Sequence, residues 1–486
     1  MEEILRIYRT SLPRMPRTAK TFAHALERSL TPLLSKCTLR PGSTALQELV
    51  ACFCAVIRHQ TQNAPLYERT YATCLARLEA LAEATGPDTP LDRNAYLVMC
   101  IAALLCEHGA TTPEAAAVVG HLLRLFEYPA YKLPALAALG YVCRTHPAYF
   151  LHAQVTAAFD GIMAAGSPAE RHLVQQILLD YLHTEAAHSA APCDTPVIDT
   201  SDMIGELRGT ARQHEDTSVA SALIQRYAEH VLQATLDVQH PALQRTANEI
   251  LQVSVLQGLS HPIQCIPYLV ALETTSDAAL RRRAVQLHRH LATKHASLLS
   301  ARYSEPMRAS FAFQQAQAAP EAPRGFRVEE GAVALLQTWY AMVREQRSGR
   351  HAFLKALVRL MDVHDADACS ADDVALAVYA AENLATLEYK LLDEPMHILH
   401  ELHLLHADVG MQVFGEARRR LAQRSPSPLT DEEDEAPAPV AHSLGLARAA
   451  AVVHIAQTLR SHLKAMYKIS ETYVVLLTQK NRQARE

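Results

Sequence analysis

Four histidines at three-residue intervals form the densest group of potential metal ligands in the chain. The group, with the two glutamates among them, comprises His397, His400, His403, His406, Glu394 and Glu401. Zinc proteases carry HExxH, which puts two histidines on one face of a helix, whereas His400 and His403 are only three residues apart. Each three-residue step turns about −60° around a helix, so the four rings spread over about half of its circumference. We therefore expect ordinary helix positions here, with a metal site as the alternative.

Motifs that would indicate another kind of chemistry are absent from the sequence. It contains no GxGxxG, GxxxxGK[ST], HExxH or GxSxG. The 10 cysteines are scattered without any CxxC, and the closest pair is Cys52 and Cys54. Such cysteines are typical of reduced, mostly buried thiols in a cytosolic or nuclear protein, with a zinc site as the alternative. The sequence predicts no enzyme, no metal and no cofactor.

Composition favours an all-helical protein. Of 486 residues only 16 are glycine and one is tryptophan, while 49% are hydrophobic. So little glycine argues against turn-dense β sandwiches and glycine-rich phosphate loops, and the abundant alanine and leucine are strong helix formers. The formal net charge of −5 excludes a globally basic, histone-like protein.

Membrane and targeting signals are weak. The longest uncharged apolar run, 95–106, has 12 residues, whereas a membrane span needs about 20. The basic residues of the first 20 positions could mimic a transit peptide, but Glu2 and Glu3 argue against one.

Proline spacing predicts the architecture. Proline is tolerated in the first turn of a helix, and here Pro113, Pro129, Pro147 and Pro168 follow one another at 16, 18 and 21 residues. Apolar residues at helical spacing fill the intervals, so two helices make a unit of about 40 residues, the period of HEAT-type hairpins. We expect a right-handed α-solenoid with more than two thirds of its residues in helices and no sheet of three or more strands.

Six segments follow from these patterns. We expect a leading segment over 1–40 that is a truncated repeat, HEAT-type repeats over 41–187, and an inter-repeat loop with one short helix over 188–217. Repeats resume over 218–423, an acidic Ser/Pro-rich disordered linker covers 424–442, and a helical segment with a basic end covers 443–486. In the linker, Ser425, Ser427 and Thr430 lie beside acids in a pattern that suits regulatory phosphorylation.

Charge is divided sharply between two adjacent regions. Residues 275–360 hold 14 Lys or Arg against 6 Asp or Glu, a net of +8, whereas 361–410 hold one Lys against 11 acids, a net of −10. Basic side chains on a solenoid face can neutralise phosphates, and the alternative is a solvated face paired with the neighbouring acids. The candidates for contact with nucleic acid or with a protein partner are Arg281, Arg282, Arg289, Lys294, Arg344, Arg347, Arg350, Lys355 and Arg359.

The stretch 242–299 resembles the C-terminal region of the sister chromatid cohesion loader family, Nipped-B or adherin. In that family a helix ends in a Q-G-L turn and the next begins with H-P-x-Q-C-x-P-Y-L; here these are 257–259 and 261–269. Later pieces also agree, among them RGFR at 324–327 and AENLATLEYKLLDEPMHILH at 381–400, and weaker similarity extends upstream over most of the chain. The positions expected to hold the family's structural motif are Gly258, His261, Pro262, Gln264, Cys265, Pro267 and Tyr268.

The resemblance implies a hook-shaped HEAT solenoid that acts in the nucleus on chromatin. It implies contact with double-stranded DNA and with cohesin, through its SMC heads and its kleisin, and stimulation of the cohesin ATPase without an active site of its own. Family members are several times longer, and the segment that binds their small TPR-repeat partner is not expected here. We therefore expect a fragment, an incomplete gene model or a reduced homologue. A HEAT-repeat adaptor in trafficking or transport is the alternative function.

Overall fold

A computed structural model describes residues 1–15, 20–109, 112–190, 203–295, 302–318, 321–423 and 440–470. Helices make up most of these residues, and the expected α-solenoid is confirmed. The chain divides into two compact units, Met1–Leu259 and Ser260–Glu486.

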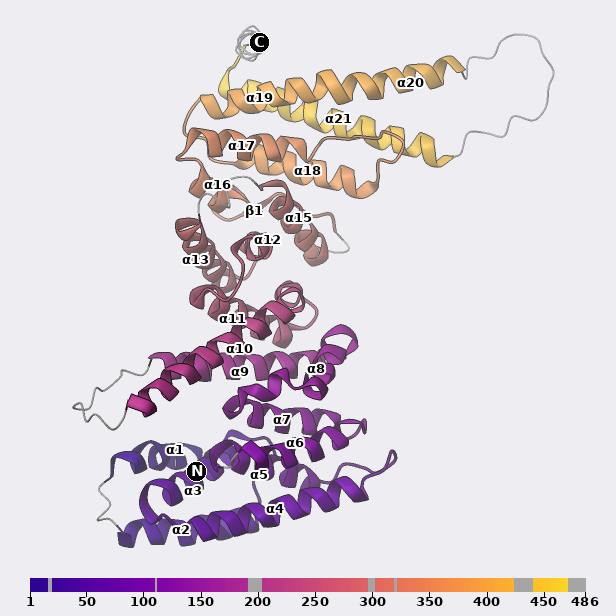
Figure 1. Cartoon of the computed structure of the whole chain (residues 1–486). Helices are drawn as coiled ribbons and strands as arrows, with labels where there is room; N and C mark the ends of the chain where they lie inside the picture. The colour runs from indigo at the N-terminus through magenta and orange to yellow at the C-terminus, as the bar shows by residue number, and fades with distance from the viewer. Residues whose placement is uncertain are drawn as a thin grey trace, which may run out of the picture. The chain divides into compact units, whose positions relative to one another are not determined.

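The first unit is a two-layered stack of helices (Figure 1). Its α-helices are α1 Glu2–Ser11, α2 Lys20–Ser35, α3 Thr44–Val56, α4 Ala64–Ala84, α5 Arg93–Gly109, α6 Thr112–Phe126, α7 Lys132–Thr145, α8 Ala153–Ala165, α9 Pro168–Ala190, α10 Met203–Thr235 and α11 Pro241–Gln257. Short 3-10 turns cover Leu12–Arg14 and Pro147–Leu151, and a π turn covers Ile57–Thr61.

Packing in this unit follows the rule of a solenoid. Each odd-numbered helix from α1 to α11 packs on the next odd-numbered one, and from α2 onward each even-numbered helix packs on the odd-numbered helix that follows it. Neighbour-on-neighbour stacking of this kind replaces a single central core. As proline spacing predicts, Pro168 and Pro241 each begin a helix.

The second unit continues with α12 Pro262–Glu273, α13 Ala278–Lys294, α15 Ser304–Ala318, α16 Gln337–Val343, α17 Arg347–Arg359, α18 Ala371–Thr386, α19 Asp393–Leu405, α20 Met411–Gln423 and α21 Val440–Tyr467. A π turn covers His406–Gly410, between α19 and α20. α12 packs against α13 and α15, α17 packs against α19, and α21 packs against α18 and α19.

A two-stranded hairpin, absent from the sequence prediction, links α15 to α16. Strand β1, Phe326–Val328, pairs antiparallel with β2, Ala332–Ala334. Gly325 precedes it and donates its N–H to the Glu382 carboxylate at 2.7 Å. A Cβ at position 325 would lie 2.3 Å from the carbonyl oxygen of Tyr379, so only glycine fits here. Within the described ranges no larger sheet is present, as expected.

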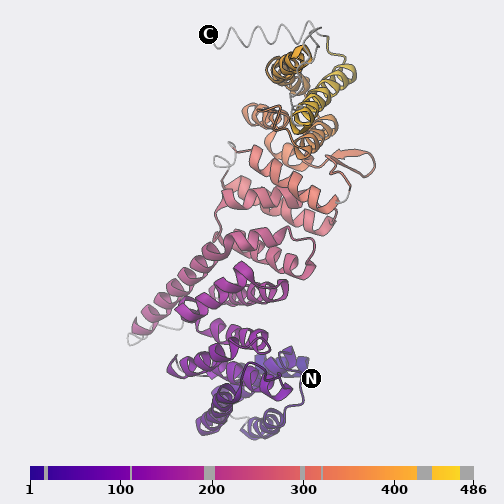
Figure 2. The ribbon, with the colours of Figure 1, turned by 90° about the vertical axis from the view of Figure 1, so that its right-hand side faces the viewer.

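Two segment boundaries differ from the sequence prediction. The loop expected over 188–217 is wrong for its second half, because α10 begins at Met203 and runs on as one continuous helix (Figure 2). The first part of this helix, 203–217, is rich in polar residues and lacks the apolar periodicity that would have indicated it. The helix expected from 443 begins at Val440. Residues 424–439 and the basic end 471–486 lie outside the described part of the chain.

Candidate nucleic-acid interface

Helix α13 presents the candidate surface, and its fold follows from its sequence. The Asp277 side chain caps the N-terminus by accepting from the backbone N–H groups of Ala279 at 2.8 Å and Leu280 at 3.3 Å. Ala284, Leu287 and Leu291 are buried at helical spacing, on the side that packs against α12. The opposite side therefore faces away from the core.

A buried pair of polar side chains, His288 and Glu273, holds this helix against α12. The Nδ1 atom of His288 lies 2.7 Å from the Glu273 carboxylate, and both side chains are 2% exposed. The His288 ring also lies 5.9 Å from the ring of Trp339, centroid to centroid. Because both polar groups are fully buried and paired with each other, they fix the orientation of α13 about its own axis. That orientation decides which arginines face outward.

Arg282 and Arg289 share the outward face of α13. Both are exposed, and seven residues separate them, which is two turns or about 10 Å along the axis. Arg283 and Lys294 are also exposed, but they lie on one flank of the helix, about 100–120° around its axis from Arg282. In the described part of the chain no carboxylate lies within ion-pair distance of these four residues, all of which remain available to an external anion.

Arg281 is directed away from this stripe. Its guanidinium donates to the Thr275 carbonyl at 2.9 Å and lies 3.5 Å from the Glu329 carboxylate at the hairpin. Glu329 also pairs with Arg327 at 3.1 Å. Burial, and then the positive charge of Arg281, lower the pKa of Arg327. Arg281 therefore ties α13 to the hairpin.

The basic residues of α17 are mostly paired with acids of α19. Arg347 lies 3.6 Å and Arg350 3.2 Å from the Asp393 carboxylate, and Lys355 lies 3.4 Å from that of Glu401. Burial raises the pKa of Asp393, but hydrogen bonds from His351 and Arg350 outweigh it and hold this pKa below its usual value.

Two further candidates have no partner acid in the described residues. Arg344 is half-buried and donates to the carbonyl of Glu388 at 3.4 Å. Arg359 is exposed at the last turn of α17. The predicted basic residues thus fall into two groups. Those on the exposed side of α13 have no acidic partner in the described residues, whereas most of those on α17 are paired with carboxylates of α19.

The part of the chain that holds this surface matches a known protein family. Residues 220–405 match the family model described as sister chromatid cohesion C-terminus, Nipped-B. This stretch includes α13, α17 and α19 with all their ion pairs. The stretch 220–405 is a Nipped-B C-terminal region.

Whole-chain comparisons agree with the family match. The human Nipped-B-like protein is 26% identical over 85% of this chain, and the fission yeast sister chromatid cohesion protein mis4 is 20% identical over 85%. The chain spans about 15% of the length of the human relative and 27% of that of mis4. The fold is that of the Chaetomium thermophilum cohesin loader SCC2 C-terminal fragment, with a TM-score of 0.74 at 20% identity over 95% of this chain and 33% of the fragment.

The Nipped-B motif residues build a turn and the start of a helix. Gly258 ends α11 in the left-handed conformation, with φ of 73°, and Pro262 begins α12 after His261. Cys265 and Pro267 are buried in α12, where burial raises the pKa of the Cys265 thiol to about 11. The other two positions, Gln264 and Tyr268, are exposed and half-buried. Gly258 and Pro262 thus shape the turn and the start of α12, and Cys265 and Pro267 pack inside it.

The histidine row of α19 is part of the helix packing. His397 stacks on His351 with ring centroids 4.2 Å apart, and its Nε2 lies 3.1 Å from the His351 carbonyl oxygen. Burial, and then the charge of His351, lower the pKa of His397 to about 4. His400 is buried, and His406 Nδ1 lies 2.8 Å from the Leu402 carbonyl oxygen. In the described residues no group of three or more His, Cys, Asp or Glu could hold a metal ion.

Sequence reasoning missed Arg283 as a surface candidate, although it lies within the run Arg281–Arg283. Its signal is helical spacing, because 283, 290 and 294 fall on one flank of the helix, about 100° around the axis from 282 and 289. The possible phosphorylation sites Ser425, Ser427 and Thr430 lie outside the described residues. Among helices in the described ranges, none is both long and apolar enough to cross a membrane.

Proposed function

We propose that this chain is a cohesin-loading factor, or the C-terminal part of one, that contacts double-stranded DNA through the outward face of α13. The observation that carries the proposal is a group of exposed basic residues on α13 that have no carboxylate within ion-pair distance in the described part of the chain, within the stretch that matches the Nipped-B C-terminus: Arg282, Arg283, Arg289 and Lys294. Cations held on a rigid helix can neutralise phosphates of a duplex without reading its bases. Binding would therefore be independent of DNA sequence.

The proposed partners are cohesin and chromatin, and the proposed place of action is the nucleus. The chain acts in the nucleus on chromatin, binds the SMC heads and kleisin of cohesin, and stimulates the ATPase of cohesin during topological loading. It contributes no catalytic group of its own. The names of its relatives, which are sister chromatid cohesion proteins and a cohesin loader, support this choice.

Ion pairs within the molecule reduce the number of basic residues that are free to bind DNA. Arg347, Arg350 and Lys355 are engaged by Asp393 and Glu401, so a DNA phosphate would have to compete with a fixed carboxylate for each of them. An exposed pair contributes about 0–1 kcal/mol, but a buried one is more costly to break. We therefore assign the DNA contact to α13, with Arg359 of α17 as a further candidate.

The experiment is a cohesin ATPase assay with and without DNA. The purified chain should raise DNA-dependent ATP hydrolysis by cohesin, and the double substitution Arg282→Glu and Arg289→Glu should abolish most of that increase. A matched control is Arg69→Glu with Arg77→Glu on α4, which reverses two exposed arginines at similar spacing and changes the net charge equally.

A different result is expected if the chain is an adaptor that binds only proteins. The chain would then bind its partner without DNA, and neither pair of reversals would change cohesin ATP hydrolysis. The same ATPase rate with and without the wild-type chain would also contradict the proposal.

A further inference from the structure

A largely apolar hollow of about 260 Å³ lies beside α4 in the first unit, and we call it the α4 hollow. Its walls come from α2, α3, α4 and α5, and Leu34, Phe53 and Ile101 are the buried apolar residues among them. A drug-sized ligand usually fills about 300–1,000 Å³, so this hollow suits one large apolar side chain better than a whole small molecule. The remaining lining residues are Thr31, Leu66, Arg69, Thr70, Thr73, Cys74, Arg77 and Val98.

Two arginines of α4 lie on the rim of the α4 hollow. Arg69 and Arg77 are both exposed, as is Thr73 between them, so the hollow opens to solvent. The two arginines are eight residues apart, or about 12 Å along the helix. In the described part of the chain neither guanidinium has a carboxylate within ion-pair distance. Each can therefore pair with an acid of a partner.

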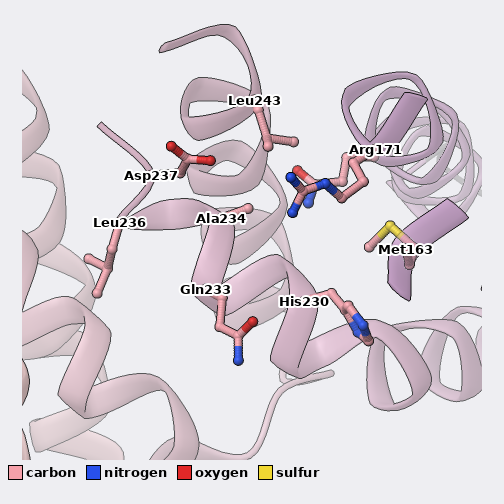
Figure 3. A pocket seen from close by; sticks show the side chains of 9 residues that line it. Met163, Arg171, His230, Gln233, Ala234, Leu236, Asp237 and Leu243 are labelled. Atoms are coloured by element: carbon pink, nitrogen blue, oxygen red, sulfur yellow. The ribbon is translucent and has the colours of Figure 1, made fainter. Parts of the chain in front are cut away.

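No acid competes for these arginines from the lining of the α4 hollow in the described part of the chain. On α2, Glu27 lies one turn before Thr31, but it is 8% exposed and accepts from the Asn63 side chain at 3.0 Å. The pocket of similar volume among α8, α9, α10 and α11 differs, because Asp237 lines it (Figure 3). An acidic segment is therefore attracted to the α4 hollow and repelled from that pocket.

The distance between the two arginines sets the spacing of the acids in an extended segment. An extended chain rises about 3.3 Å per residue, and its side chains at i−2, i and i+2 project to the same side. Four residues therefore span about 13 Å, close to the distance of about 12 Å between Arg69 and Arg77. A segment with one acid two residues before a large apolar residue and another two residues after it can place all three side chains at once.

We propose that the α4 hollow binds an extended segment of a partner protein other than cohesin, with the pattern acid-x-apolar-x-acid. The apolar side chain contacts Phe53 and Ile101, and the two acids pair with Arg69 and Arg77. Burial of the apolar side chain supplies most of the affinity, and the exposed ion pairs orient the segment. The α4 hollow lies in the first unit and the α13 surface in the second, so this proposal does not rest on the DNA contact.

Fluorescence anisotropy of labelled peptides, titrated with the full chain, tests the proposal. The probe is fluorescein-Gly-Glu-Ser-Leu-Ser-Glu-Gly-amide. A control peptide of the same composition, with Ser-Glu-Leu-Glu-Ser at its centre, directs both acids to the side opposite the leucine. The probe should bind saturably, and the control peptide should bind about fivefold more weakly because it forms neither ion pair. A probe with Ala in place of Leu should bind at least about tenfold more weakly.

Substitutions on α4 locate the binding site. Thr73→Trp fills the α4 hollow from an exposed position and should weaken probe binding at least about tenfold. Ala72→Trp adds the same bulk at an exposed neighbour that does not line the hollow, and it should leave binding unchanged. Arg69→Glu with Arg77→Glu should weaken probe binding about tenfold, whereas Arg282→Glu with Arg289→Glu on α13 should leave it unchanged.

Four results would overturn the proposal. Failure of the probe to bind saturably would show that the α4 hollow is not a docking site. Equal affinities for the probe and the control peptide would exclude the proposed register of the acids. Equal losses in Thr73→Trp and Ala72→Trp would place the contact elsewhere on α4. A loss of cohesin ATPase stimulation in Arg69→Glu with Arg77→Glu would place a cohesin segment in the hollow. The peptide comparisons use the wild-type chain, so they stand even if a variant fails to fold.

Discussion

The guanidinium of Arg350 on α17 lies 3.2 Å from the carboxylate of Asp393 on α19, and the Arg350 side chain is only 8% exposed. Glu394, which is 1% exposed, lies 3.7 Å from the same guanidinium. One buried cation therefore balances two carboxylates. The basic and acidic regions that are adjacent in the sequence neutralise each other at this point.

Arg350→Met should destabilise the protein by about 3–5 kcal/mol, because it leaves the buried Glu394 without its counter-charge. The measurement is the free energy of unfolding in urea. Arg347→Met is the matched control, since Arg347 is 75% exposed and pairs with the same Asp393, and it should cost less than about 1 kcal/mol. Equal losses in the two variants would contradict this account of the pair.

Gly258→Ala should lower the free energy of unfolding by about 1–2 kcal/mol. Its φ of 73° is strained for a residue with a Cβ, and no atom within 4 Å would clash with that Cβ, so the cost comes from the backbone alone. Gly120→Ala in α6 is the control, because nothing lies near a Cβ there either and no positive φ is present. It should stabilise the protein by about 0.5–1 kcal/mol.

The sequence predicts the helices well where proline and apolar spacing coincide, as at Pro241 with Leu243, Ala247 and Ile250. It does not predict ion pairs between separate helices, because spacing along α17 cannot reveal that Asp393 packs beside Arg350. The α4 hollow was missed for the same reason, since Thr31 and Ile101 are 70 residues apart in the chain. The hairpin was missed because its strands are only three residues long.

Protonation of His108 should lower the free energy of unfolding as the pH drops from 6.5 to 4. Burial, and then the charges of Arg144, Arg9 and Arg58, lower the pKa of His108 from 6.5 to about 4. The unfolded chain therefore binds a proton at this position that the folded chain excludes, and the contribution of His108 to stability decreases with falling pH by up to about 3 kcal/mol.

The free energy of unfolding of His108→Gln, relative to that of the wild type, should rise as the pH drops from 6.5 to 4, as measured by urea unfolding at each pH. His152→Gln, at an exposed histidine, should keep the wild-type pH dependence. A His108→Gln curve parallel to that of the wild type would disprove the contribution of this group.

The salt dependence of DNA binding tests the central proposal most directly. The measurement is the slope of log affinity against log salt concentration on duplexes of two unrelated sequences. If Arg282 and Arg289 each neutralise a phosphate, the double substitution to Glu should weaken binding and reduce the slope by at least about 1.8. The Arg69→Glu with Arg77→Glu control should keep the wild-type slope on both duplexes. An unchanged slope in the α13 variant, or an equal reduction in the control, would contradict the assignment of DNA binding to α13.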